Sequence, residues 1–324
     1  MLYAISFANY SKFIDSLISK YDVVGPVKRD VVSFEKLKSS SELYFDVLPE
    51  YTARSVLFDY KELIFSSVKG KLVEPEVVKK DQKKTVILGL RKCDLSAIKK
   101  HELAFNGNFK DPYFNKRRNN TLLFGYLQKD CGDGYCFCQS VDLDSGFDLF
   151  FYRRFDHYLV ETGSKNGESI IREFRFFFDD TKYSLTDEDR KIANSLKLHS
   201  HDINDIYDNT KGWAGLVEDC LSCGQCNILC PTCYCFEFKE VSNRDGSFDK
   251  FRCPSECQLE CFSRVAGNHV FRKSQLDRFK HRIYHQLQYF KERFGKTLCV
   301  GCGRCIRHCP TKIDFVSKIN EMKK

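Results

Sequence analysis

The chain reads Cys220-Leu-Ser-Cys223-Gly-Gln-Cys226-Asn-Ile-Leu-Cys230-Pro231 and, with the same spacing, Cys299-Val-Gly-Cys302-Gly-Arg-Cys305-Ile-Arg-His-Cys309-Pro310. Both runs follow the pattern C-x2-C-x2-C-x3-C-P, which is typical of bacterial ferredoxins that bind [4Fe–4S] clusters. A cubane cluster needs four thiolates, and three closely spaced cysteines on one tight loop can wrap one of its faces. Two such runs predict two clusters, and hence a protein through which electrons pass.

The fourth cysteine of each run is expected to bind the cluster of the other run. In ferredoxins with two clusters, the cysteine that precedes proline crosses over in this way. The rule assigns one cluster to Cys220, Cys223, Cys226 and Cys309, and the other to Cys299, Cys302, Cys305 and Cys230.

Three glycines within the runs support a cluster site. Gly224, Gly301 and Gly303 should let the backbone turn close to sulfur, so that amide N–H groups can bond the cluster. Structural zinc is the alternative, but zinc sites favour paired C-x2-C motifs over a doubled run of four cysteines that ends in proline.

Length and composition are typical of a cytoplasmic globular protein with about two domains. No apolar run approaches the ~18–20 residues that span a membrane, and residues 1–8 lack the basic flank and the length of a signal peptide. Seventeen cysteines in a chain of 324 residues indicate metal binding and not disulfides. Because oxygen destroys exposed low-potential clusters, the sequence favours an anaerobic host.

The formal net charge of +8 suggests a nucleic-acid-binding protein at first sight. However, a [4Fe–4S] core with four thiolates carries a charge of about −2, so three clusters would bring the net charge to roughly +2. Basic residues near the runs then compensate for buried negative charge. The alternative function is a zinc-stapled module that binds RNA through its basic surface.

Residues 1–205 are predicted to form an α/β domain. Residues 85–90 and 121–127 are short continuous apolar runs, as expected of strands that are buried on both faces. A helix is predicted over 94–105, a later strand pair over 147–152 and 158–161, and a helix that starts at the Thr186–Asp189 capping box and runs to about residue 198.

Residues 206–324 are predicted to form a two-cluster, ferredoxin-like α+β domain with a helical insertion. Apolar residues spaced three or four apart predict the inserted helix over 276–294, with Ser274 capping its start and Gly295 ending it. The other face of this helix is basic and is expected to be solvated, or to dock an acidic partner. That face carries Arg278, Lys280, Arg282, Lys291 and Arg293.

A third set of cysteines follows the two buried strands. Cys93 comes soon after residues 85–90, and Cys131, Cys136 and Cys138 follow residues 121–127. Sites in parallel α/β sheets form beyond the carboxyl ends of strands, so these four thiols meet if the two strands are neighbours. They would suit a third [4Fe–4S] cluster, with zinc or four unrelated thiols as the alternatives.

Five cysteines remain, namely Cys233, Cys235, Cys253, Cys257 and Cys261. The last three are spaced i, i+4 and i+8, which would place them on one face of a helix. They either form a further metal site with the first two or are small core residues.

Taken together, these motifs resemble the iron–sulfur (beta) subunit of soluble NiFe sulfhydrogenases and the corresponding iron–sulfur subunit of anaerobic sulfite reductases. The resemblance covers nearly the whole chain. It rests on Gly89-Leu-Arg-Lys-Cys93-Asp94, on Cys131 with Tyr135-Cys136-Phe137-Cys138, on Gly146-Phe-Asp-Leu-Phe150, on residues 220–235, and on Cys299-Val-Gly-Cys-Gly-Arg-Cys305. One departure is Pro-Ser-Glu before Cys257, where the family tends to have Trp-Asp-Ser, and Cys253 and Cys261 look additional.

The resemblance implies a subunit of a larger complex and strengthens the expectation of a third cluster. In such a complex a flavin subunit exchanges hydride with NAD(P)H, this subunit relays single electrons, and a third subunit holds a hydrogenase or a sulfur or sulfite reductase site. The chain shows no G-x-G-x-x-G, P-loop or H-E-x-x-H motif, so no catalytic residue is predicted.

Overall fold

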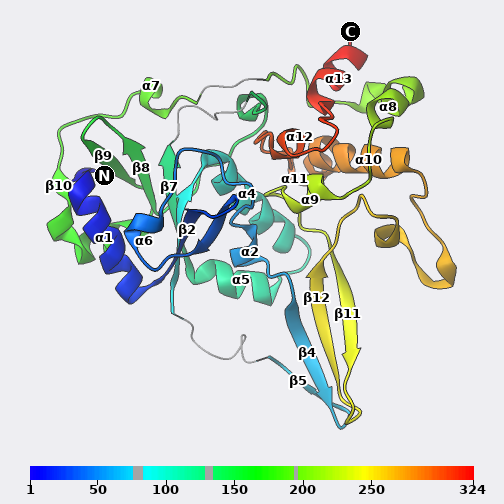
Figure 1. The fold of residues 1–324 in the computed structure, drawn as a ribbon, viewed down its shortest axis with the longest axis horizontal. Coiled ribbons are helices and arrows are strands. Elements are labelled where there is room, and N and C mark those ends of the chain that lie inside the picture. The colour runs from blue at the N-terminus through cyan, green and yellow to red at the C-terminus, as the bar shows by residue number, and fades with distance from the viewer. Residues whose placement is uncertain (76–82, 128–133, 193–195) are drawn as a thin grey trace.

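An eight-stranded sheet and a projecting four-stranded sheet organise the chain in the computed structural model (Figure 1). The structure describes residues 1–75, 83–127, 134–192 and 196–324. Helices cover both faces of the larger sheet, and the C-terminal helices gather at one end of it (Figure 1). None of the helices in these described ranges has the length and apolarity needed to cross a bilayer.

The larger sheet has the order β10-β1-β9-β8-β7-β6-β2-β3, and its central strands β2, β6, β7 and β8 are parallel neighbours. Its strands are β1 (Leu2–Ser6), β2 (Asp22–Lys28), β3 (Val32–Lys36), β6 (Thr85–Leu90), β7 (Thr121–Leu127), β8 (Leu149–Arg153), β9 (His157–Thr162) and β10 (Asp179–Asp180).

Strand β6 is buried on both faces; successive side chains point to opposite sides of the sheet, and a register shift between Leu88 and Leu90 turns Leu90 to the same side as Ile87. Val86 and Leu88 belong to one core with helix α1 (Phe7–Lys20), whereas Ile87 and Leu90 belong to the core on the other face. That second face is covered by α2 (Arg54–Leu57), α4 (Lys92–Phe105) and α5 (Pro112–Asn119). The predicted strands over 85–90 and 121–127 are therefore confirmed, as are the helix over 94–105 and the later strand pair, which forms β8 and β9.

The predicted helix over 187–198 is wrong in length. The capping box at Thr186 and Asp189 forms, but helix α7 covers only Asp187–Arg190. Lys92 Nζ donates to the Arg190 carbonyl at 2.5 Å, and the Leu196 N–H donates to the Cys136 carbonyl at 2.9 Å. These contacts hold Arg190 and Leu196 beside the third set of cysteines, and residues 193–195 of the predicted helix lie outside the described residues.

The four-stranded sheet projects from the body as an arm (Figure 1). It is antiparallel with the order β11-β12-β4-β5, and its strands are β4 (Glu62–Val68), β5 (Lys71–Val73), β11 (Phe236–Ser242) and β12 (Phe248–Pro254). The arm pairs strands from both sides of residue 205. The division into 1–205 and 206–324 stays a prediction, and the arm is one of the contacts that cross it.

The C-terminal helices pack around Trp213, Ile283, Leu287, Ile306 and Ile319, which are all buried. The inserted helix begins after Ser274, whose side chain accepts from the Asp277 N–H, and ends at Gly295 with φ +74°, as predicted. It contains a π-helical segment that the sequence did not predict, so that it consists of α10 (Gln275–Tyr284), the segment His285–Tyr289 and α11 (Phe290–Phe294). The other helices are α6 (Lys165–Glu173), α8 (Thr210–Val217), α9 (Gln225–Ile228), α12 (Arg304–Arg307) and α13 (Phe315–Met322).

Candidate iron–sulfur sites

The first cavity gathers cysteines from both runs. Cys220 and Cys223 lie on the loop before α9, Cys226 lies within α9, and Cys309 follows α12. These four are the set that the crossover rule assigns to one cluster, and Cys305 of the second run also lines this cavity.

The second cavity is lined by the complementary set. Two of its cysteines lie on the loop that leads into α12, one lies within α12, and one follows α9. They are Cys299, Cys302, Cys305 and Cys230. The structure therefore brings together each predicted group of four, while the bonds from these residues to iron stay a prediction.

Both runs adopt the same loop conformation. Ser222 and Gly301 occupy equivalent positions with φ of +52° and +61°, and Gly224 and Gly303 do so with φ of +76° and +73°. The Ser222 N–H donates to Cys220 Sγ at 3.5 Å, and the Gly301 N–H donates to Cys299 Sγ at 3.3 Å. Left-handed turns thus direct backbone amides at cysteine sulfur, which is a contact that helps to set cluster potentials.

The chemistry of these donors fits a cationic iron core. Burial raises the pKa of Cys226 and of Cys302 to about 12, although the nearby Arg282 and Arg304, respectively, oppose the rise. Such buried thiols would hold their protons at neutral pH unless a positive centre among them stabilised the thiolates. Four cysteines around one cavity are the ligand set that a [4Fe–4S] cluster uses.

A third cavity lies beyond the carboxyl ends of β6 and β7. These two strands are parallel neighbours, which is the condition under which the third set of cysteines was predicted to meet. Cys93, Cys136 and Cys138 line it, and all three are buried. Cys131, the fourth predicted ligand, lies outside the described residues. Cys302 of the second run also lines this cavity, which the sequence did not indicate.

Residues next to the third set of cysteines contact the second run directly. The Phe137 N–H donates to the Gly301 carbonyl at 2.8 Å. Asp94, which follows Cys93 on α4, forms an ion pair with Arg304 at 3.0 Å, and both side chains are almost completely buried. The residues next to the third set of cysteines and the loop of the second run therefore form one packed unit.

The three cavities follow one another in a row because neighbouring cavities share a cysteine in their linings. Cys305 lines the first and the second cavity, and Cys302 lines the second and the third. The second cavity therefore occupies the middle position.

The five remaining cysteines do not lie on one helix. Cys253 lies in strand β12, next to its end at Pro254, and the next helical turn is a short one at Glu260–Ser263, so the condition that 253–261 be helical is not met. Cys235 contacts both Cys233 and Cys257, and the Asn227 side-chain amide donates to Cys257 Sγ at 3.2 Å. Across the described residues, no three His, Cys, Asp or Glu side chains converge closely enough to hold a single metal ion.

Two arginines of the basic helix face are buried, contrary to the expectation of a solvated face. Arg278 and Arg282 are 8% and 4% exposed. Arg278 Nε donates to the Gln258 carbonyl at 2.8 Å, and Arg282 Nη2 donates to the Cys226 carbonyl at 2.8 Å. The sequence signal that could have found them is their spacing, since Arg282 directly precedes Ile283 of the apolar stripe and lies three residues after Phe279.

Comparison with known proteins agrees with this geometry. Residues 219–313 match the 4Fe-4S dicluster domain family, which covers both cysteine runs. The chain is 34% identical to sulfhydrogenase 2 subunit beta of Pyrococcus furiosus, over 97% of this chain and 96% of that protein. A shorter match, 32% identical, joins 25% of this chain to 16% of an uncharacterized iron–sulfur protein of Methanococcus maripaludis. The chain is thus a mixed α/β protein with a C-terminal 4Fe-4S dicluster domain, and it belongs to the family of sulfhydrogenase beta subunits.

Proposed function

We propose that this chain relays single electrons through three [4Fe–4S] clusters, between a flavin-containing, NAD(P)H-linked subunit and a separate catalytic oxidoreductase subunit. The observation that carries the proposal is the row of three cysteine-lined cavities, in which each neighbouring pair shares a cysteine. A row of this kind suits the passage of electrons from one end of the chain to the other.

The ligands follow from the linings of the cavities, in a two-cluster, ferredoxin-like arrangement. Cys220, Cys223, Cys226 and Cys309 would hold the first cluster, and Cys299, Cys302, Cys305 and Cys230 the second. Cys93, Cys131, Cys136 and Cys138 would hold the third, on the support of three described thiols in one cavity and of the resemblance of the whole chain.

When bound, a [4Fe–4S] cluster takes up and releases one electron at a time. The residues of this chain direct amide N–H groups at sulfur and supply buried cations. Arg282 lines the first two cavities, and Arg91 lines the third with 6% of its surface exposed.

The number of electrons that a hydride carries implies a flavin partner. A hydride carries two electrons, so a flavin must split the pair before a one-electron relay can act. The beta-subunit name of the Pyrococcus furiosus relative supports a role inside a complex with other subunits. The alternative of a zinc-stapled RNA-binding module has no support from the comparisons.

The test uses the purified full chain, reconstituted with iron and sulfide under anaerobic conditions. We expect about twelve irons per chain, four in each cluster, and reduction by dithionite but not by NADH or NADPH. Addition of the flavin subunit that purifies with the chain should then allow NAD(P)H to reduce the clusters. Oxidation of NAD(P)H by the isolated, flavin-free chain would overturn the proposal.

A further inference from the structure

A single buried arginine lies between the first two cavities. Arg282 is on α10, in the segment that separates the two cysteine runs in the sequence, and its side chain is 4% exposed. It lines the first and the second cavity, and its guanidinium contacts the Cys305 side chain. Cys305 is also the cysteine that the two cavities share.

The hydrogen bonds of Arg282 leave part of its guanidinium facing the sulfurs. Nη2 donates to the Cys226 carbonyl at 2.8 Å, whereas Nε has no hydrogen-bond partner within the part of the chain that the structure describes. Since a buried unpaired N–H group costs free energy, this donor is expected to find an acceptor when the site is filled.

The charge of Arg282 also lacks an ordinary counter-ion. Among residues 1–75, 83–127, 134–192 and 196–324, no carboxylate forms an ion pair with it, although a buried cation without compensation is strongly unfavourable. Burial alone would lower the pKa of Arg282, but Cys226, Cys305 and other neighbouring cysteines raise it well above its usual value. The groups that face this guanidinium from both cavities are therefore cysteine side chains, which become thiolates when a cluster binds.

We propose that Arg282 is the shared counter-cation of the two ferredoxin-type clusters and sets the reduction potential of both. The inference rests on the proposed function, because it assumes that both cavities hold clusters. Reduction makes a cluster one charge more negative, and a buried cation favours that state. Arg282 is thus a positioning residue that holds both potentials at a higher value than the cysteines alone would give.

The test is a redox titration of the reconstituted full chain, followed by electron paramagnetic resonance. In Arg282→Gln and Arg282→Met, we expect the potentials of both clusters to fall by at least the equivalent of a tenfold change in the reduction equilibrium, which is about 59 mV for one electron. Arg282→Lys keeps the charge and should restore most of the loss.

Arg278→Gln is the matched control. Arg278 lies one turn earlier on the same helix and is also buried, but it lines neither cavity. It donates to the carbonyls of Gln258 and Lys273 and to Ser222 Oγ of the first run, and none of its hydrogen bonds within the described ranges reaches the second run. Its removal should leave the potential of the second-run cluster unchanged.

The outcomes separate the inference from the proposed function. Unchanged potentials in an iron-replete Arg282→Gln chain would overturn the role of Arg282 and leave the relay intact. Loss of both clusters in the two neutral variants, with the lysine variant intact, would support a requirement for the charge. Loss of clusters in all three variants would assign Arg282 to packing and overturn the inference. Absence of [4Fe–4S] signals from the unmodified chain would overturn the cluster assignment and the role of Arg282 with it.

Discussion

At the scale of single residues, the last cysteine of each run belongs to the opposite cavity. Cys309 lines the first cavity with Cys220, Cys223 and Cys226, although it lies within the second run. Cys309→Ser should therefore damage the cluster held mainly by the first run, and Cys230→Ser the cluster held mainly by the second. Iron content and the paramagnetic signals of the reduced chain would report which cluster is lost. Loss of the second-run cluster from Cys309→Ser would show that the crossover is wrong.

Gly224 and Gly303 occupy equivalent positions in the two runs, so the effects of alanine at these two positions can be compared. Gly224 and Gly303 share a left-handed conformation, so alanine should cost each site about 1–2 kcal/mol. At Gly303 the new Cβ would also lie 2.6 Å from the backbone oxygen of Tyr135, beside the third set of cysteines. At Gly224 it would meet nothing nearer than Glu256 Cγ at 3.4 Å.

Gly303→Ala should therefore lower the free energy of unfolding more than Gly224→Ala, and it should also reduce the iron bound at the third cavity. Denaturant unfolding and iron analysis of the two variants would measure these effects. Equal losses in the two variants would contradict the close contact between the second run and the Tyr135 loop.

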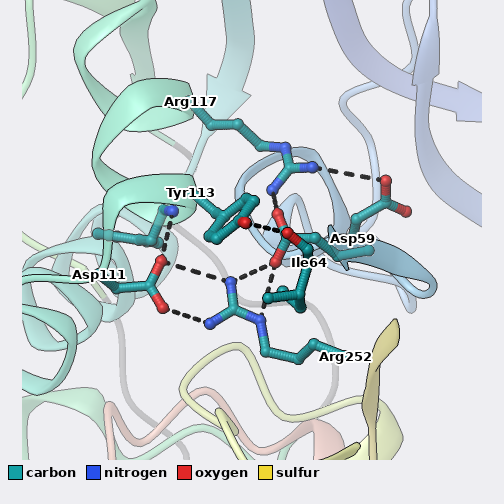
Figure 2. A network of polar contacts seen from close by, with 8 residues as sticks. Asp59, Ile64, Asp111, Tyr113, Arg117 and Arg252 are labelled. Carbon is teal, nitrogen blue, oxygen red and sulfur yellow. Dashed lines mark hydrogen bonds and ion pairs between the residues drawn. The ribbon is translucent and has the colours of Figure 1, made fainter. Parts of the chain in front are cut away.

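At the scale of elements, a buried ion network attaches the arm to the body. Figure 2 shows Arg252 of β12 facing Asp111, and Arg117 of α5 facing Asp59. Glu62 of β4 pairs with both arginines and is 2% exposed. Tyr113 completes the group through a hydrogen bond from its hydroxyl to the Ile64 carbonyl.

Glu62→Gln should be strongly destabilising, because it leaves the buried guanidinium of Arg252 and the partly buried one of Arg117 short of negative charge. Removing one partner of a buried ion network costs about 3–5 kcal/mol. Glu240→Gln, in the exposed pair with Lys250 on the same sheet, should cost less than about 1 kcal/mol. Urea unfolding monitored by circular dichroism would compare the two variants. A Glu62 variant as stable as the Glu240 variant would contradict this role of the network.

The same elements show what local sequence patterns can and cannot predict. Strands β6 and β7 were predictable because every residue from Val86 to Leu90 and from Thr121 to Leu127 is buried, which leaves an unbroken apolar run. The pairing of β4 with β12 joins Ser66 to Asp249, and no local pattern encodes a contact over that separation. The predicted length of the helix after Thr186 was wrong for a related reason, since tertiary hydrogen bonds override helix propensity beyond Arg190.

The cysteine sites were predictable because spacing alone constrains a cluster loop. The partners of the buried cations were not, because the spacing of an arginine beside an apolar stripe indicates burial but not which groups its side chain faces. Arg304 lies inside the second run and pairs with Asp94 from a helix about 200 residues earlier. Only the packing of α4 against the second run brings these two charges together.

At the scale of the whole molecule, the order of the cavities limits the route of electrons. Among the described cysteines, none lines both the first and the third cavity, whereas each of these cavities shares one with the second. The second-run cluster is therefore the expected intermediate between the two ends. Cys223 lines the first cavity and is exposed, which places that end of the row at the surface.

Removal of the middle cluster should divide the relay without destroying its ends. Cys299 lines the second cavity and neither of the others, so Cys299→Ala should lose the second cluster and keep the first and third. Dithionite, a small reductant, should still reduce both remaining clusters. NAD(P)H acting through the flavin subunit should reduce only the cluster at the flavin end, because the rate of electron transfer falls steeply with distance.

Freeze-quenched paramagnetic resonance of the complex would measure both reactions, with Cys253→Ala as a cysteine control outside all three cavities. Full reduction of both end clusters by NAD(P)H in the Cys299 variant would rule out a linear relay, whereas reduction of one end would also identify the side on which the flavin subunit docks.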